Sequence, residues 1–207
     1  MALVKYNDNS ISAISSAGQL ATGSLVPIKT LTASGSASLS FVHGSDGVVL
    51  DSTYPIYKFQ WNDCNPATDD IRWEFQGSTN GGSSYGVTMT STKFKAVHLE
   101  NDTYTDLSYL SFQDLAQSTS YKNLSNGQGN GADECCVGTL YLFNPSSTTF
   151  VKNWMARTNM YQTDNYPEDN FCAGYFNTTS SIDAIQFRFS SGNIDSGTIK
   201  LYGIKDS

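Results

Sequence analysis

The feature that most constrains this chain is a period of two in its apolar residues, repeated in short runs between turns. Ile185, Phe187 and Phe189 alternate with Gln186 and Arg188. Successive side chains of an extended strand point to opposite faces, so this run predicts a strand with one buried face. A connection rich in Ser, Gly and Asn occupies residues 190–197, and residues 198–204 then resume the alternation. A second strand is therefore expected there.

Similar runs recur along most of the chain, and no long stretch has a helical period. The further expected strands are residues 28–32, 37–42, 54–61, 71–76, 85–89, 92–99, 138–143, 149–157 and 171–177. Residues 106–117 fit either a helical turn or a strand and bend. The number and spacing of the runs predict an all-β fold, a two-sheet antiparallel β-sandwich that is jelly-roll-like.

The apolar residues among the first 27 positions follow neither the period of two of a strand nor the period of a helix. They predict an extended N-terminal arm in front of a sandwich domain at residues 28–207. Apolar side chains without a pattern for packing on their own lose exposed area by lying on a neighbour. We therefore expect the arm to bind a partner through Leu3, Val4, Tyr6, Ile11, Ile14 and Leu20.

Charge and hydropathy argue against two classes of partner. The net charge is −7, the pI is about 4.6, and no basic cluster exists to bind nucleic acid through its phosphates. No apolar stretch approaches the roughly 18 residues of a membrane span, and no basic region followed by an apolar one opens the chain. We expect synthesis in a cytoplasm, and there the four cysteines would be free thiols. Of the neighbours Cys135 and Cys136, one should be buried and one partly exposed.

Few residues of tunable pKa could converge on a catalytic site. The two histidines are His43, in an expected loop, and His98, which alternates with apolar residues on an expected strand. Paired carboxylates such as Asp69 and Asp70 lie in turns, and a glycosidase would need two of them facing each other across a cleft. We expect no catalytic residue, cofactor or metal. The default role of Trp61, Trp73 and Trp154 is core packing, with a sugar-stacking platform as the alternative.

Several phrases of the sequence resemble a family of virion structural proteins from tailed phages of aquatic bacteria, including cyanophages. They are MALVKYN at residues 1–7, IKTLTAS at 28–34, LYLFNPSSTTFVK at 140–152, AGYFNTTS at 173–180 and SSGNIDSGTIKLYG at 190–203. The resemblance implies a non-enzymatic β-sandwich that coats or decorates the particle as a homotrimer.

The leading interpretation is a head decoration (cement) protein that is made in the host bacterial cytoplasm and binds the major capsid protein in the virion. A tail, fibre or adaptor component with glycan-binding ability is the alternative within the virion. A carbohydrate-active enzyme is the alternative from another class.

Overall fold

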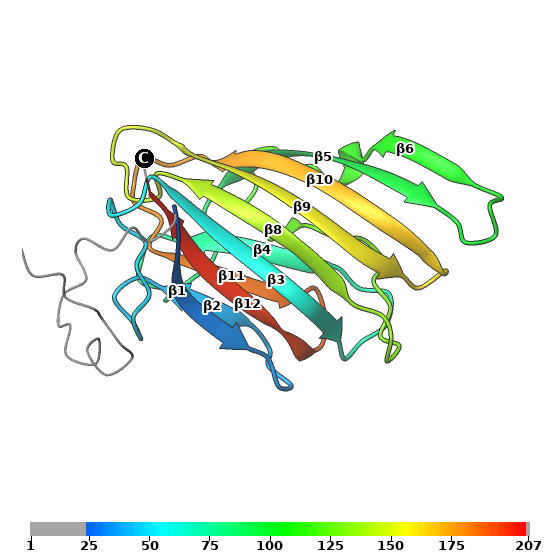
Figure 1. Ribbon diagram of the computed structural model, residues 1–207. Helices are drawn as coiled ribbons and strands as arrows, with labels where there is room; N and C mark the ends of the chain where they lie inside the picture. The colour runs from blue at the N-terminus through cyan, green and yellow to red at the C-terminus, as the bar shows by residue number, and fades with distance from the viewer. Residues whose placement is uncertain (1–23, 206–207) are drawn as a thin grey trace, which may run out of the picture.

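The computed structural model describes residues 24–205 and is almost entirely β-structure. Two antiparallel sheets pack face to face, with the larger sheet in front of the smaller in Figure 1, and form a jelly-roll-like β-sandwich. The expected fold class is confirmed. Among the described residues, the helical structure is a single 3-10 turn, η1 (Ser111–Gln113).

The larger sheet has eight strands and the smaller has four. In spatial order the first holds β1 (Leu25–Thr32), β12 (Ile194–Ile204), β3 (Ile56–Pro66), β8 (Cys136–Phe143), β9 (Lys152–Gln162), β10 (Tyr166–Phe176), β5 (Met89–His98) and β6 (Thr105–Tyr109). The second holds β2 (Leu39–Val42), β11 (Ala184–Phe189), β4 (Trp73–Ser78) and β7 (Lys122–Asn123). Strands β8, β9 and β10 form a meander, whereas β2, β4 and β11 alternate in sequence with strands of the other sheet.

The core between the sheets is built on aromatic rings. The Phe187 ring stacks on Trp73 with centroids 5.9 Å apart, and it lies 5.8 Å from Trp61 and 5.5 Å from Phe59 of the opposite sheet. Rings in offset or tilted contact add to the free energy that their buried area already supplies. Trp61, Trp73 and Trp154 are all at most 1% exposed, which confirms core packing as their role.

The alternation over residues 185–189 has the expected orientation. Phe187 and Phe189 are buried, while the guanidinium of Arg188 lies 3.6 Å above the Tyr121 ring and donates to Glu74 Oε2 at 3.3 Å. Gln186 Nε2 donates to Ser40 Oγ at 2.9 Å on the same outward side. The prediction of an inner Phe face and an outer polar face is confirmed.

The bounds of several expected strands shift, most of all in β9, which runs to Gln162, and β10, which begins at Tyr166. Two other local predictions are wrong. Residues 85–88 are not a strand, since the chain crosses there from β4 to the larger sheet and β5 begins at Met89. The expected turn at residues 190–197 is shorter, because β12 already begins at Ile194, which is buried and pairs with Pro66. Gly197 has a φ of +125° and sits in an irregularity of the β12–β3 pairing, so its conformation serves a bulge within a strand.

The first strand, β1, begins at Leu25, three residues before the expected start of the domain at residue 28. The stretch that fitted either a helical turn or a strand and bend contains both kinds of structure, β6 and η1. The six residues expected to bind a partner through the arm lie outside the described residues.

Candidate functional site

The outer face of the larger sheet, the side turned away from the smaller sheet, carries apolar side chains that reach solvent. Register places Phe94, Phe171 and Arg157 in one row across β5, β10 and β9. The next row contains Met155 of β9 beside Tyr141 of β8. Tyr109 of β6 pairs with Phe94 and extends the first row. We call Phe94, Tyr109, Tyr141, Met155 and Phe171 the apolar strip. It crosses strands that are far apart in sequence and adjacent in the sheet.

Specific contacts hold the apolar strip in place. The rings of Phe94 and Phe171 are stacked, with centroids 4.8 Å apart and planes 4° apart. The Arg157 guanidinium lies 4.7 Å from the Phe171 centroid. Arg157 Nε also donates to both oxygens of Asp169, at 3.0 and 3.1 Å, and this charge-assisted pair fixes the guanidinium over the ring.

Exposure and shape mark the apolar strip as a contact surface. Met155 is 52% exposed, Phe94 42% and Tyr109 58%. A shallow depression with a volume of about 330 Å³ lies between Phe94, Tyr141 and Arg157, and a second of about 580 Å³ continues past Met155 to Tyr175. A group of solvent-exposed apolar side chains on a sheet face is better suited to bind another protein than to bind a small polar ligand.

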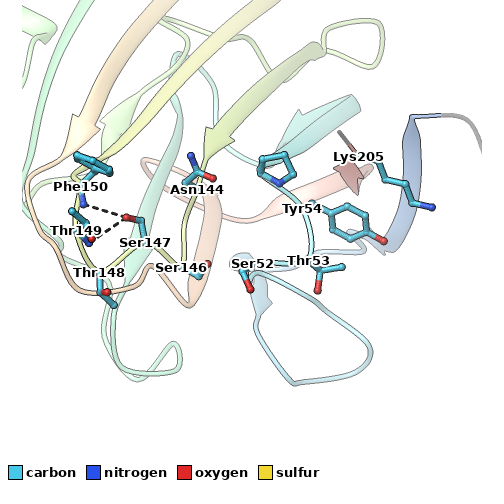
Figure 2. Close-up of a pocket in the computed structure, with 11 residues that line it drawn as sticks. Ser52, Thr53, Tyr54, Asn144, Ser146, Ser147, Thr148, Thr149, Phe150 and Lys205 are labelled. Atoms are coloured by element: carbon cyan, nitrogen blue, oxygen red, sulfur yellow. Dashed lines mark hydrogen bonds between the residues drawn. The ribbon is translucent and has the colours of Figure 1, made fainter. Parts of the chain in front are cut away.

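A second candidate surface lies at one end of the sandwich, where the loops before β3 and after β8, together with Lys205, surround an open pocket of about 770 Å³ (Figure 2). Tyr54 and Lys205 line one side, and the β8–β9 loop, with Ser147 and Phe150, lines the other. Ser147 Oγ accepts hydrogen bonds from the backbone N–H groups of Thr149 at 3.2 Å and Phe150 at 3.1 Å, so its hydroxyl shapes the loop.

The pocket is lined mainly by Ser and Thr hydroxyls, with the aromatic rings of Tyr54 and Phe150 at its borders. Its remaining lining residues are Ser52, Thr53, Pro55, Asn144, Ser146, Thr148 and Thr149. Hydroxyl and amide groups with a Tyr and a Phe at the borders could hydrogen-bond and stack on a hydroxylated ligand such as a glycan. None of the described residues that line it carries a carboxylate or an imidazole, so the pocket itself supplies no acid–base pair.

The described residues do not bring the expected titratable groups together. His98 pairs with Asp102 on the surface at 3.0 Å, and His43 Nδ1 accepts the backbone N–H of Leu50 at 3.1 Å. No group of three or more His, Cys, Asp or Glu side chains in this part of the chain is arranged to hold a metal ion.

Cys136 is buried and Cys135 partly exposed, as expected. No helix in the described range is long and apolar enough to span a membrane.

Sequence reasoning missed a polar region buried between the sheets. Lys93 is fully buried, and its Nζ donates to Gln113 Oε1 at 2.7 Å and to the carbonyl of Ser125 at 3.0 Å. Lys122 Nζ donates to the carbonyl of Gln113 at 2.8 Å. Desolvation lowers the pKa of the Lys93 ammonium to about 8. Its partners come from the segment between β6 and β8, so no local pattern could reveal them.

The apolar strip had a faint signal in the sequence. Residues 171–176 of β10 contain no charged or amide side chain, so both faces of that strand are apolar or small.

Comparison of the chain with known protein families, curated proteins and solved structures finds no match.

Proposed function

We propose that this protein is a structural component of a phage virion, a head decoration protein that binds and stabilises the capsid lattice without catalysing a reaction. The observation that carries the proposal is the apolar strip, a group of exposed and half-buried aromatic and Met side chains on the outer face of the larger sheet. Met and aromatic residues are enriched where proteins bind one another. The sequence phrases that resemble virion structural proteins support the same assignment.

The strip has the composition of an interface core with a polar border. Phe94, Phe171 and Met155 supply apolar area, and the Arg157–Asp169 pair beside them supplies oriented hydrogen-bonding groups. At roughly 25 cal/mol per Å² of buried apolar area, a few such side chains contribute several kcal/mol before ordering costs. The proposed partner of this surface is the major capsid protein.

The proposal includes a homotrimer. A decoration protein that repeats a modest contact three times on one rigid body binds firmly, because the second and third contacts form at high effective concentration. The apolar residues of the arm, Leu3 to Leu20, would add contacts that attach each subunit to the particle.

Binding to particles that lack the native protein tests the proposal. Cryo-EM of decorated particles should place the sandwich on the head, with the apolar strip against a capsid subunit. Met155→Asp introduces a charge into the strip at an exposed site, and we expect a loss of binding of at least tenfold. Phe150→Asp, at an exposed site of the end pocket, is the matched control and should bind like the unchanged protein.

The alternative is a tail, fibre or adaptor component that binds glycans, and the hydroxyl-rich end pocket favours it. Under that alternative, density for the protein lies on the tail, and Phe150→Asp abolishes retention on host surface glycans while Met155→Asp does not. Either result contradicts the head decoration assignment. Turnover of a glycan by the purified protein would contradict both non-enzymatic assignments.

A further inference from the structure

Three reactive groups meet inside the sandwich on β5 and β10. Lys95 and Asn170 are directly opposite each other in the antiparallel pairing, and Glu168 lies two residues before Asn170, on the same face of β10. Glu168 and Asn170 are fully buried, and the Lys95 side chain is 15% exposed. An amine, a carboxylate and a carboxamide are thus placed side by side, largely shielded from water.

The hydrogen bonds of this trio are incomplete. Lys95 Nζ donates to Glu168 Oε2 at 2.8 Å. Glu168 Oε1 and both polar atoms of the Asn170 amide have no partner among the described residues. Buried polar groups in folded proteins are nearly always paired, so an amide left free beside an ammonium and a carboxylate needs a reason. Opposed side chains have Cβ atoms about 5 Å apart, which lets a Lys nitrogen reach the neighbouring amide carbon.

We propose that Lys95 and Asn170 become joined by an intramolecular isopeptide bond, with Glu168 as the catalytic residue that moves the protons. The Glu168 carboxylate accepts a proton from the Lys95 ammonium, which frees the nitrogen lone pair to attack Cγ of Asn170. The acid then protonates the amide oxygen, and a tetrahedral intermediate forms.

Collapse of the intermediate completes the reaction. The C–N bond to the original amide nitrogen breaks, Glu168 carries a proton from the Lys95 nitrogen to the leaving group, and nitrogen departs as ammonia. As the C=O double bond re-forms, the oxygen gives up the proton that Lys95 first carried, and Glu168 passes this proton to ammonia. The new Nζ–Cγ amide is therefore neutral, the leaving group departs as ammonium, and Glu168 ends as a carboxylate. No oxidant, reductant or second substrate is consumed.

The fold supplies what makes this reaction possible. Holding nucleophile and electrophile on adjacent strands replaces a bimolecular encounter with an intramolecular one, which can be worth many orders of magnitude in effective concentration. Loss of ammonia to solvent makes the step irreversible.

Lys93 is the neighbouring inward-facing lysine on β5, but its nitrogen already donates hydrogen bonds to Gln113 and Ser125. The residue opposite it on β10 is Cys172, which offers no amide carbon to attack. The inference stands independently of the proposed function.

Mass spectrometry of the full-length protein tests the bond directly. The intact mass should be lower than the sequence mass by about 17 Da, the mass of one ammonia. Peptide mapping should recover one branched peptide that joins the segments containing Lys95 and Asn170. A succinimide at an Asn-Gly step, such as Asn80-Gly81, causes the same loss without joining two peptides, and finding only that product overturns the proposal. A full sequence mass overturns it as well.

Three variants separate the roles. Lys95→Arg keeps a positive charge for Glu168 but removes the nucleophilic amine, and Asn170→Ala removes the electrophile, so each should show no branched peptide. Glu168→Gln should form it at least tenfold more slowly. Lys93→Met, the matched control on the same strand and face, should form it fully. If a variant fails to fold, the branched peptide of the unchanged protein still decides the question.

Discussion

Phe94 and Phe171 stack face to face across β5 and β10 on the solvent side of the larger sheet, 4.8 Å apart between centroids. Because this pair lies on the surface, its removal should affect stability and binding very differently. Phe94→Ala should lower the free energy of unfolding by only about 1 kcal/mol, the usual worth of an aromatic pair. Urea unfolding followed by circular dichroism measures this cost. A cost as large as that of a core Phe would mean that the strip is part of the core.

Phe187→Ala provides the contrasting case in the core. Its ring contacts Trp61, Trp73 and Phe59, so truncation should cost roughly 3 to 5 kcal/mol in the same unfolding experiment. Gln186→Ala, next to it on the outward side, removes the hydrogen bond donated to Ser40 Oγ and the one accepted from the Tyr121 hydroxyl, and should cost about 1 to 2 kcal/mol. Equal effects at the two positions would contradict the register of β11.

The buried Lys93 predicts an unusual dependence of stability on pH. Desolvation lowers its pKa from 10.5 to about 8 in the folded protein. Between these values the unfolded chain binds the proton and the folded protein does not, so the free energy of unfolding rises with pH across this window. Below about pH 8 both states hold the proton and the full cost of burying the charge remains.

Lys93→Met isolates this effect from those of other groups. Relative to the variant, the unchanged protein should gain up to about 3 kcal/mol of stability as the pH rises from about 8 to 10.5, as 1.4 kcal/mol per pKa unit implies. Lys200→Met on the outer face controls for the loss of one positive charge. A stability difference between Lys93→Met and the unchanged protein that stays constant over the window would contradict a depressed pKa.

The cysteines should differ in reactivity in the native protein. Burial raises the pKa of the Cys64 thiol to about 12 and that of Cys136 far above its usual value, and both side chains are inaccessible. Since the thiolate is the reactive form, a haloacetamide at mildly alkaline pH should label the partly exposed Cys135 first. Peptide mass spectrometry measures the order, and labelling in urea, where all four should react, is the control. Equal rates at Cys64 and Cys135 in the native state would be inconsistent with this packing.

Much of the fold follows from local patterns, and β5 shows where such a pattern fails. The alternation at residues 185–189 predicts the correct faces because its inner residues are all apolar. In β5 the same rule would turn Phe94 inward and Lys93 outward, whereas the structure has the reverse. Lys93 can be buried because Gln113 and Ser125 satisfy its ammonium, and these residues lie 20 and 32 positions away.

The candidate surfaces were harder to predict than the strands. The apolar strip is assembled from β5, β6, β8, β9 and β10, so its members become neighbours only through sheet order. The end pocket combines loops that precede β3 and follow β8 with Lys205 after β12. The sequence supplied the residue types for both surfaces, but strand pairing decides which of them meet.

The pairing of β1 with β12 also sets the order of events during synthesis. Leu25 of β1 pairs with Ile204 of β12, and β12 in turn fills the place between β1 and β3. On a ribosome that adds residues one by one, β1 and the free edge of β3 emerge long before the strand that completes them. Such distant pairings give a high contact order and slow folding. Until β12 emerges, the nascent chain exposes strand edges that can pair wrongly, and its yield in cells would depend on chaperones that cover them.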